Sequence, residues 1–212
     1  MFTRRLKFIP AGVAAAAIGG GAYGIVGATA SGSSNTAVTA SAFGPGSGRA
    51  SNARSGPAAG GTVGTVATVS KSGFTVATSA GQTVTVKSSS TVKKGATVLV
   101  LGTTNGTTIT ATHVIAQKRS TSSSAVVPFR SGAPSASKQV GQIPANYQQG
   151  SGTIVSGTAA DNATRAALDA YPGGIVDRVV RLSNGEYEVH NIGVNWPHHV
   201  FVGKSFKVVG AN

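Results

Sequence analysis

The sequence contains no cysteine, only five acidic residues and a single tryptophan among its 212 residues. Without cysteine the chain holds no disulfide, no iron–sulfur cluster, no thiolate zinc site and no cysteine nucleophile. Charged residues make up 11% of the chain, against about 25% in an average soluble protein, and aromatic residues make up only 6%. This composition argues against one large aromatic core, and five carboxylates argue against a carboxylate-rich metal cage.

The few acidic residues all lie late in the chain, at Asp161, Asp169, Asp177, Glu186 and Glu188. Residues 1–160 carry 13 lysines and arginines and no carboxylate, whereas residues 161–212 carry five basic and five acidic residues. The basic part is expected to attract polyanions such as nucleic acid, anionic lipid or acidic cell-wall polymer, with a strength that falls as salt rises.

The N-terminus indicates where the protein works. Basic residues lie within Met1–Lys7, residues 8–30 carry no charge, and Ala28-Thr29-Ala30 has the small–x–small pattern of a signal-peptidase site. This order predicts an export signal over residues 1–30, either a cleaved signal peptide or an uncleaved membrane anchor, because the uncharged run is long enough to span a bilayer. The rest of the chain is then extracytoplasmic, secreted or membrane-anchored. That location argues against nucleic acid and nucleotide cofactors as partners.

Two Ser- and Gly-rich stretches, residues 31–60 and 118–157, are expected to be disordered linkers. Between them, residues 61–117 alternate valine and threonine with short turn signals, which predicts a small all-β unit that closes as a barrel. A loop at Ser79-Ala80-Gly81 would place Val76 opposite Val84 and Phe74 opposite Val86, and Asn105-Gly106 favours a two-residue turn. The five expected strands lie near 62–69, 74–78, 82–87, 96–102 and 107–116.

Four short motifs mark this segment: Gly61-Thr62-Val63, Phe74-Thr75-Val76, Gly95-Ala96-Thr97-Val98 and Ile109-Thr110-Ala111-Thr112. With them, residues 61–117 resemble a small bacterial all-β family of unknown function found in exported proteins. The resemblance implies a fold and no catalytic residues. Phe74 is the only aromatic residue of the segment and is expected in its core. Because single-stranded nucleic acid binds on exposed aromatic side chains, we do not expect nucleic acid as a partner.

Residues 158–212 predict a helix followed by strands. Thr158-Ala159-Ala160-Asp161 has capping-box spacing, an alanine-rich stretch continues the helix, and Tyr171-Pro172-Gly173-Gly174 ends it. Strands are expected near 175–182, 186–193 and 199–209. A two-residue turn at Asn184-Gly185 would set Leu182 opposite Tyr187, Val180 opposite Val189 and Arg181 opposite Glu188.

The expected fold class is therefore α+β. A small five-stranded β-barrel-like module and a C-terminal helix packed on a small antiparallel sheet would be joined by disordered linkers.

The C-terminal motifs are the alanine-rich helix into Ala170-Tyr171-Pro172-Gly173, then Ile175-Val176-Asp177-Arg178-Val179, Ser183-Asn184-Gly185-Glu186-Tyr187-Glu188-Val189-His190 and Phe206-Lys207-Val208-Val209-Gly210. On these motifs, residues 158–212 resemble the PepSY domain. The resemblance implies a module that accompanies secreted peptidases and inhibits or modulates them. The sequence has no peptidase motif of its own, so such a peptidase would be another chain.

One loop departs from the PepSY pattern and is the candidate binding loop, with Trp196, His198 and His199 as its candidate residues. Two adjacent histidines on a strand point to opposite faces and chelate one ion poorly, and His190 joins one of them only if the fold brings it near. We therefore expect no metal site and no cofactor. His113 is expected to be an ordinary strand residue.

The sequence contains no nucleophile elbow, and no catalytic residues and no enzyme activity are expected. Two functions remain open. In the first, the chain is a non-enzymatic exported envelope protein whose PepSY-like module regulates or binds a partner, such as a secreted peptidase or another envelope protein. In the second, it is a surface-binding or structural module whose basic N-terminal part holds anionic cell-wall polymer or lipid.

Overall fold

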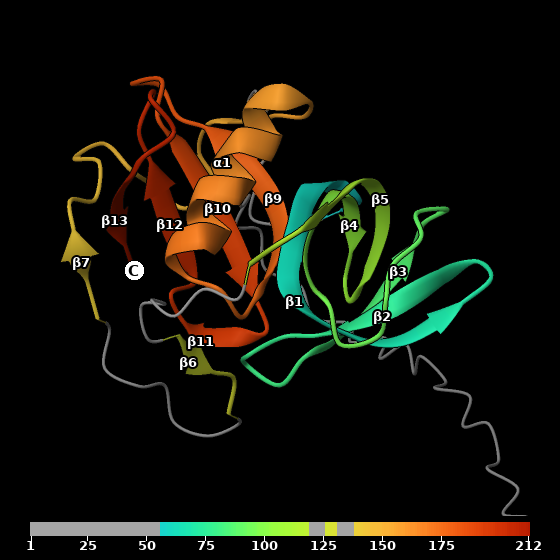
Figure 1. Ribbon diagram of the computed structural model, residues 1–212. Coiled ribbons are helices and arrows are strands. Elements are labelled where there is room, and N and C mark those ends of the chain that lie inside the picture. Colours follow the sequence, from blue (N-terminus) through green and yellow to red (C-terminus); the bar gives the residue numbers. More distant parts are fainter. Residues whose placement is uncertain (1–55, 119–125, 131–137) are drawn as a thin grey trace, which may run out of the picture. The chain divides into compact units, whose positions relative to one another are not determined.

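The computed structural model describes residues 56–118, 126–130 and 138–212 (Figure 1). The expected export signal and most of the first expected linker lie outside these residues. Contacts group all of these residues into one unit. No helix in the described part of the chain is long and apolar enough to cross a membrane.

Thirteen strands and one helix make up the described part, which is therefore mostly β. In chain order the elements are β1 (Ala58–Ser70), β2 (Gly73–Ala77), β3 (Thr83–Lys87), β4 (Thr97–Asn105), β5 (Thr108–Ala116), β6 (Val127–Pro128), β7 (Val140–Gly141), β8 (Thr153–Ile154), α1 (Thr158–Ala170), β9 (Ile175–Arg181), β10 (Tyr187–Ile192), β11 (Val194–Trp196), β12 (His199–Val202) and β13 (Val208–Ala211).

Eleven of these strands form one mixed sheet, in the order β2-β3-β5-β4-β1-β9-β10-β12-β13-β7 with β8 paired to β9. The expected α+β class, with a separate five-stranded barrel and a separate small sheet, is therefore wrong. Strands β1 to β5 do pair in a ring, because β2 also pairs with β1. However, β1 also pairs with β9 through Gly61 and Thr62, which joins both parts of the chain in one sheet.

Glycine allows β1 to lie between β4 and β9. A Cβ atom at Gly60 would lie 2.0 Å from the carbonyl oxygen of Val176, and one at Gly61 would lie 2.2 Å from that of Val100. The Thr62 hydroxyl adds a hydrogen bond of 2.9 Å to the Gly174 carbonyl. The close approach of three strand backbones is therefore possible only where side chains are absent.

The hairpin of β2 and β3 has the register that its loop predicts. Phe74 lies opposite Val86 and Val76 opposite Val84, and all four side chains are buried in the ring. Gly81 has φ 85°, the conformation that the third residue of such a loop requires. The Asn105-Gly106 turn was predicted one residue too early, because Asn105 pairs with Thr108 and the turn residues are 106 and 107.

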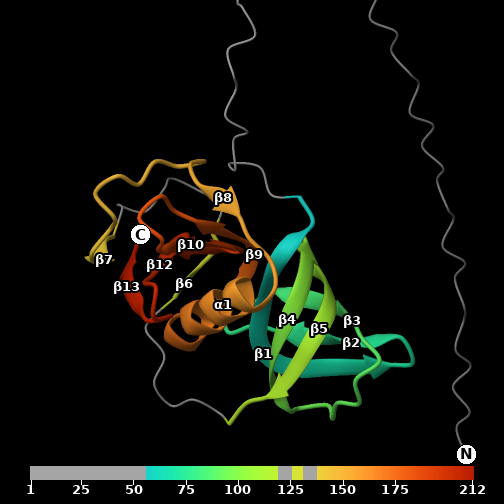
Figure 2. The same ribbon diagram turned by 90° about the horizontal axis from the view of Figure 1, so that it is seen from above.

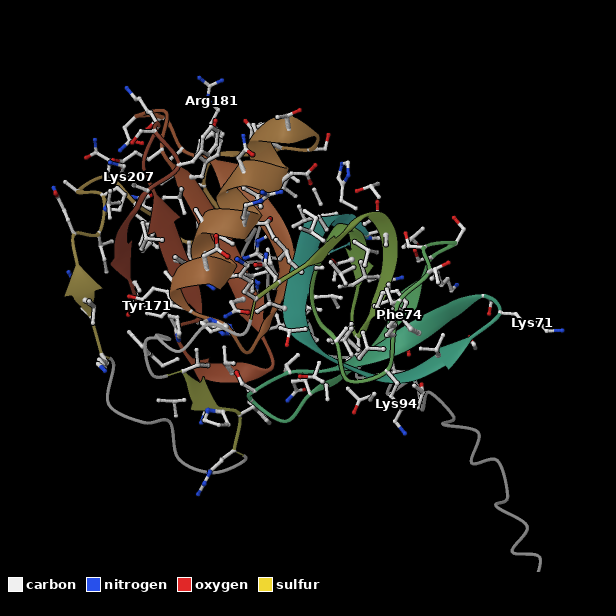
Figure 3. All side chains as sticks on the ribbon, viewed as in Figure 1. Lys71, Phe74, Lys94, Tyr171, Arg181 and Lys207 are labelled. Carbon is white, nitrogen blue, oxygen red and sulfur yellow. The ribbon has the colours of Figure 1, made fainter. Side chains whose placement is uncertain are left out.

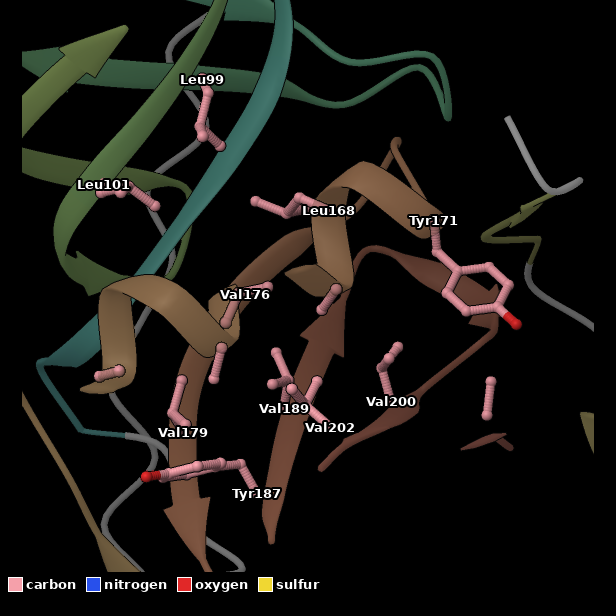
Figure 4. Packing of buried hydrophobic residues seen from close by; sticks show 14 of the residues in the cluster. Leu99, Leu101, Leu168, Tyr171, Val176, Val179, Tyr187, Val189, Val200 and Val202 are labelled. Carbon is pink, nitrogen blue, oxygen red and sulfur yellow. The ribbon is translucent and has the colours of Figure 1, made fainter. Parts of the chain in front are cut away.

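Helix α1 lies against β9, β10 and β12 (Figure 2). Its N-cap is Gly157, without a side-chain cap, so the capping box expected at Thr158 does not form. The helix packs through small residues and Leu168 onto the sheet, as Figure 4 shows for the side chains of Val176, Val179, Val189, Val200 and Val202. This packing covers one face of the C-terminal strands.

The hairpin of β9 and β10 has a different register from the expected one. Tyr187 lies opposite Arg181 and Glu188 opposite Val180, so the expected pair of Arg181 with Glu188 is wrong. The Leu182 amide donates to the Glu186 carbonyl at 2.8 Å, and Gly185 has φ 84°. Residues 183–185 therefore form a three-residue loop with glycine last, like residues 79–81, and this extra loop residue shifts every pair by one.

Two further segments differ from the simple strand-and-linker reading. The strand expected over residues 199–209 is two antiparallel strands, β12 and β13, because the chain reverses where Phe206 takes φ 56°. The segment expected as a linker, residues 118–157, contributes β6, β7 and β8 to the sheets. Within it, Ile143 and Tyr147 pack on Val180, Leu182 and Phe201.

Candidate functional site

A β-bulge brings unusual charge into the interior of the C-terminal sheet. His190 pairs with Arg178 and Asn191 with Val176, which leaves Asp177 as the extra residue of β9. A bulge changes the direction in which side chains leave a strand. Asp177 and Arg178 are both buried, with exposed fractions of 3% and 1%, so this sheet contains ionisable groups that normally stay in water unless they are paired.

The first pair in the cluster joins Asp177 and His190. The Nδ1 atom of His190 lies 2.6 Å from Oδ1 of Asp177, and both side chains are almost fully buried. Because an ionised carboxylate only accepts hydrogen bonds, Nδ1 carries the hydrogen and donates it. In the neutral ring the other nitrogen, Nε2, then carries a lone pair.

The second group centres on the buried carboxylate of Glu188. Its Oε1 atom accepts from Nδ1 of His199 at 2.7 Å and lies 3.8 Å from NH2 of Arg178. The Tyr147 hydroxyl oxygen lies 3.2 Å from the same Nδ1 atom. Burial, and after it the charge of Glu188 with a hydrogen bond to that carboxylate, raise the pKa of Tyr147 well above its usual range. The phenol therefore keeps its proton, and the Tyr147 ring lies beside the pair of Glu188 and His199.

The third histidine, His198, completes a triangle of rings. Ring centres lie 4.7 Å apart for His190 and His198, 5.3 Å for His190 and His199, and 5.4 Å for His198 and His199. His198 is exposed as a residue, but its ring lies against the other two. Desolvation, and after it the charges of His190 and His199, lower the pKa of His198 to about 4, against opposing contributions from Asp177 and a hydrogen bond to the Val194 backbone.

The predicted binding loop thus divides between two places. His198 and His199 join His190, whereas Trp196 packs edge-on against Tyr171 with ring centres 5.3 Å apart, on the helix side of the sheet. The indole Nε1 donates to the Lys138 carbonyl, and the Lys138 ammonium lies 4.4 Å above the ring. The indole is therefore buried and is not an exposed ligand platform.

Sequence reasoning noted His190 and the buried acids but did not place them together. The expected register set Glu188 opposite Arg181, whereas Glu188 lies opposite Val180. The available signal was the alternation of Glu188 and His190 on one face of β10, opposite the start of the next strand at His199. His113 lies apart from the cluster, with a 60% exposed side chain 3.9 Å from Asp161 of α1.

The ring of strands β1 to β5 presents a different chemistry. Four exposed lysines come from its turns and strand ends, and Figure 3 labels two of them, Lys71 and Lys94; the set is Lys71, Lys87, Lys93 and Lys94. No acidic residue lies before Asp161. The charge of this surface is therefore balanced by no carboxylate of its own.

No family model, no curated protein and no solved structure matches this chain.

Proposed function

We propose that this chain is a non-enzymatic exported protein of the cell envelope whose C-terminal half binds and regulates a partner. The basic and then apolar N-terminus supports export. A secreted peptidase is the partner class that the resemblance to PepSY implies, and another envelope protein is the broader class.

The observation that carries the proposal is the distribution of exposed apolar side chains. Six large apolar residues are exposed in the described part of the chain, and five of them follow residue 126: Val127, Phe129, Val140, Ile154 and Val209. Ile154 also lines a surface hollow between residues 144–155 and the turn at residues 181–184. Val140 and Val209 lie on the paired strands β7 and β13, and exposed apolar side chains that are contiguous mark sites of protein association.

The test uses the full chain immobilised and exposed to envelope extract, with peptidase activity as the readout. We expect the chain to retain a peptidase and to change its hydrolysis rate. Ile154→Ser is expected to weaken both effects, because it removes an apolar side chain from the hollow. Val69→Ser is the matched control, since Val69 is also an exposed apolar residue but lies on β1. The proposal would be contradicted if a saturating concentration of the chain left the hydrolysis rate unchanged. It would also be contradicted if Val69→Ser weakened retention and rate change as much as Ile154→Ser does.

A second candidate function rests on the lysines of the ring. A surface with four exposed lysines and no carboxylate of its own attracts anionic wall polymer or lipid headgroups through long-range charge. Retention of the full chain on an anionic polymer should fall with rising salt. The variant Lys93→Gln with Lys94→Gln should be retained less, and Lys204→Gln with Lys207→Gln should not. Retention that is independent of salt would exclude this function.

A further inference from the structure

Three of the four histidines of this chain meet at one place. Strand pairing sets His190 directly opposite His199, and His198 precedes β12, which begins at His199. The rule that adjacent strand residues point to opposite faces therefore does not separate His198 from His199. The sequence argued against a shared site only because it placed His198 and His199 on the same strand.

The size of the triangle is that of a metal site. Three imidazoles that bind one zinc ion at about 2.1 Å in tetrahedral directions have ring centres about 5 Å apart. The observed separations are 4.7, 5.3 and 5.4 Å. No large movement of the backbone is needed to bring three ligand nitrogens around one ion.

The surrounding hydrogen bonds prepare two of the rings. Nδ1 of His190 donates to Asp177 and Nδ1 of His199 donates to Glu188. Metal-binding histidines usually donate their second nitrogen to a carboxylate in this way, which fixes the ring and makes the free nitrogen a better ligand. The same pattern directs Nε2 of both rings to the role of ligand atom.

The charge of the pocket also suits a cation. The pocket contains two buried carboxylates, Asp177 and Glu188, and one buried guanidinium, Arg178. When all three are ionised, their net charge is negative. Imidazole nitrogens are ligands that zinc, copper and nickel share, whereas magnesium and calcium prefer oxygen.

We propose that His190, His198 and His199 bind one divalent transition-metal ion of the zinc type, with a fourth position open. As the side chains stand, no group of three or more histidine or acidic residues in the described ranges can hold an ion. Binding therefore requires a change of side-chain conformation. His198 is the ring most free to turn, because it is exposed while His190 and His199 are held by carboxylates. The ion enters from the exposed side of His198.

The test is a zinc titration of the untagged full chain by calorimetry, after treatment with a chelator. We expect one ion per chain. His198→Asn should weaken binding at least about tenfold, in the range seen when metal-site residues are removed. His113→Asn is the matched control and should bind zinc like the unchanged chain, because His113 lies outside the triangle.

A second measurement does not depend on any variant. Nitrogen NMR of the imidazole rings should show Nε2 of His190 and His199 shifting on addition of zinc, with His113 unmoved. Absence of zinc uptake would overturn the proposal. So would uptake that survives His198→Asn unchanged, or zinc-dependent shifts confined to His113.

Discussion

Glu188 lies 2.7 Å from His199 and 3.8 Å from Arg178 in the interior of the sheet. The neighbouring basic residue Arg181 is exposed. The one-residue shift of the β9–β10 hairpin thus decides which arginine neutralises the buried acid. This relationship gives the sharpest test of the register.

Arg178→Met should destabilise the protein strongly, because it leaves Glu188 buried with less compensating charge. Removing one partner of a buried ion pair costs about 3–5 kcal/mol. Arg181→Met is the matched control and should change the free energy of unfolding by no more than about 0.5 kcal/mol. Urea denaturation measures both, and a larger loss for Arg181→Met would disprove the observed register.

Gly60→Ala should disrupt the junction between β1 and β9. The added Cβ would lie 2.0 Å from the Val176 carbonyl oxygen, and a backbone atom cannot turn aside as a side chain does. We expect a loss of stability of about 1–3 kcal/mol. Gly56→Ala, where no atom lies within 4 Å of the added Cβ, is the control. Equal thermal stability of the two variants would show that β1 does not need this close approach.

Gly81→Ala should destabilise the β2–β3 hairpin for a purely conformational reason. Gly81 has φ 85° and no atom within 4 Å of an added Cβ, so no clash contributes. The left-handed conformation costs alanine about 1–2 kcal/mol. Gly81→Asn should lose less, because asparagine tolerates that conformation. Chemical denaturation that ranks asparagine below alanine would contradict this explanation of the loop.

Tyr147 should make stability fall at alkaline pH. Its folded pKa is raised by burial, whereas the phenol of the unfolded chain ionises near pH 10. The unfolded state therefore loses a proton first, and the contribution of the buried phenol is present below about pH 10 and decreases as the pH rises above it. Unfolding free energies at rising alkaline pH should fall less steeply for Tyr147→Phe. Parallel curves would mean that Tyr147 ionises freely.

Local chemistry predicted part of this fold. The Ser79-Ala80-Gly81 loop fixed the register of β2 and β3, and the extent of the helix followed from its alanines and from Tyr171-Pro172. The closely similar Ser183-Asn184-Gly185 loop was interpreted as a two-residue turn, because Asn-Gly favours that turn in isolation. One residue of difference then moved Glu188 to another neighbour.

The pairing of strands that are far apart in the chain could not be predicted from the sequence. Nothing local indicates that Gly61 and Thr62 pair with Ile175 and Val176, since the free energy of that contact depends on the whole sheet. The histidine triangle has the same origin. It depends on the pairing of His190 with His199 and on the bulge at Asp177, and neither has a sequence signature of its own.

The proposed function depends above all on export, and fractionation of the native protein with N-terminal sequencing tests export directly. We expect the protein outside the cytoplasm, beginning at Ser31 if the signal is cleaved, or in the membrane fraction with Met1 intact if the segment is an anchor. Recovery of the intact chain from the cytosol would contradict the proposal and return nucleic acid to the possible ligands of the basic residues.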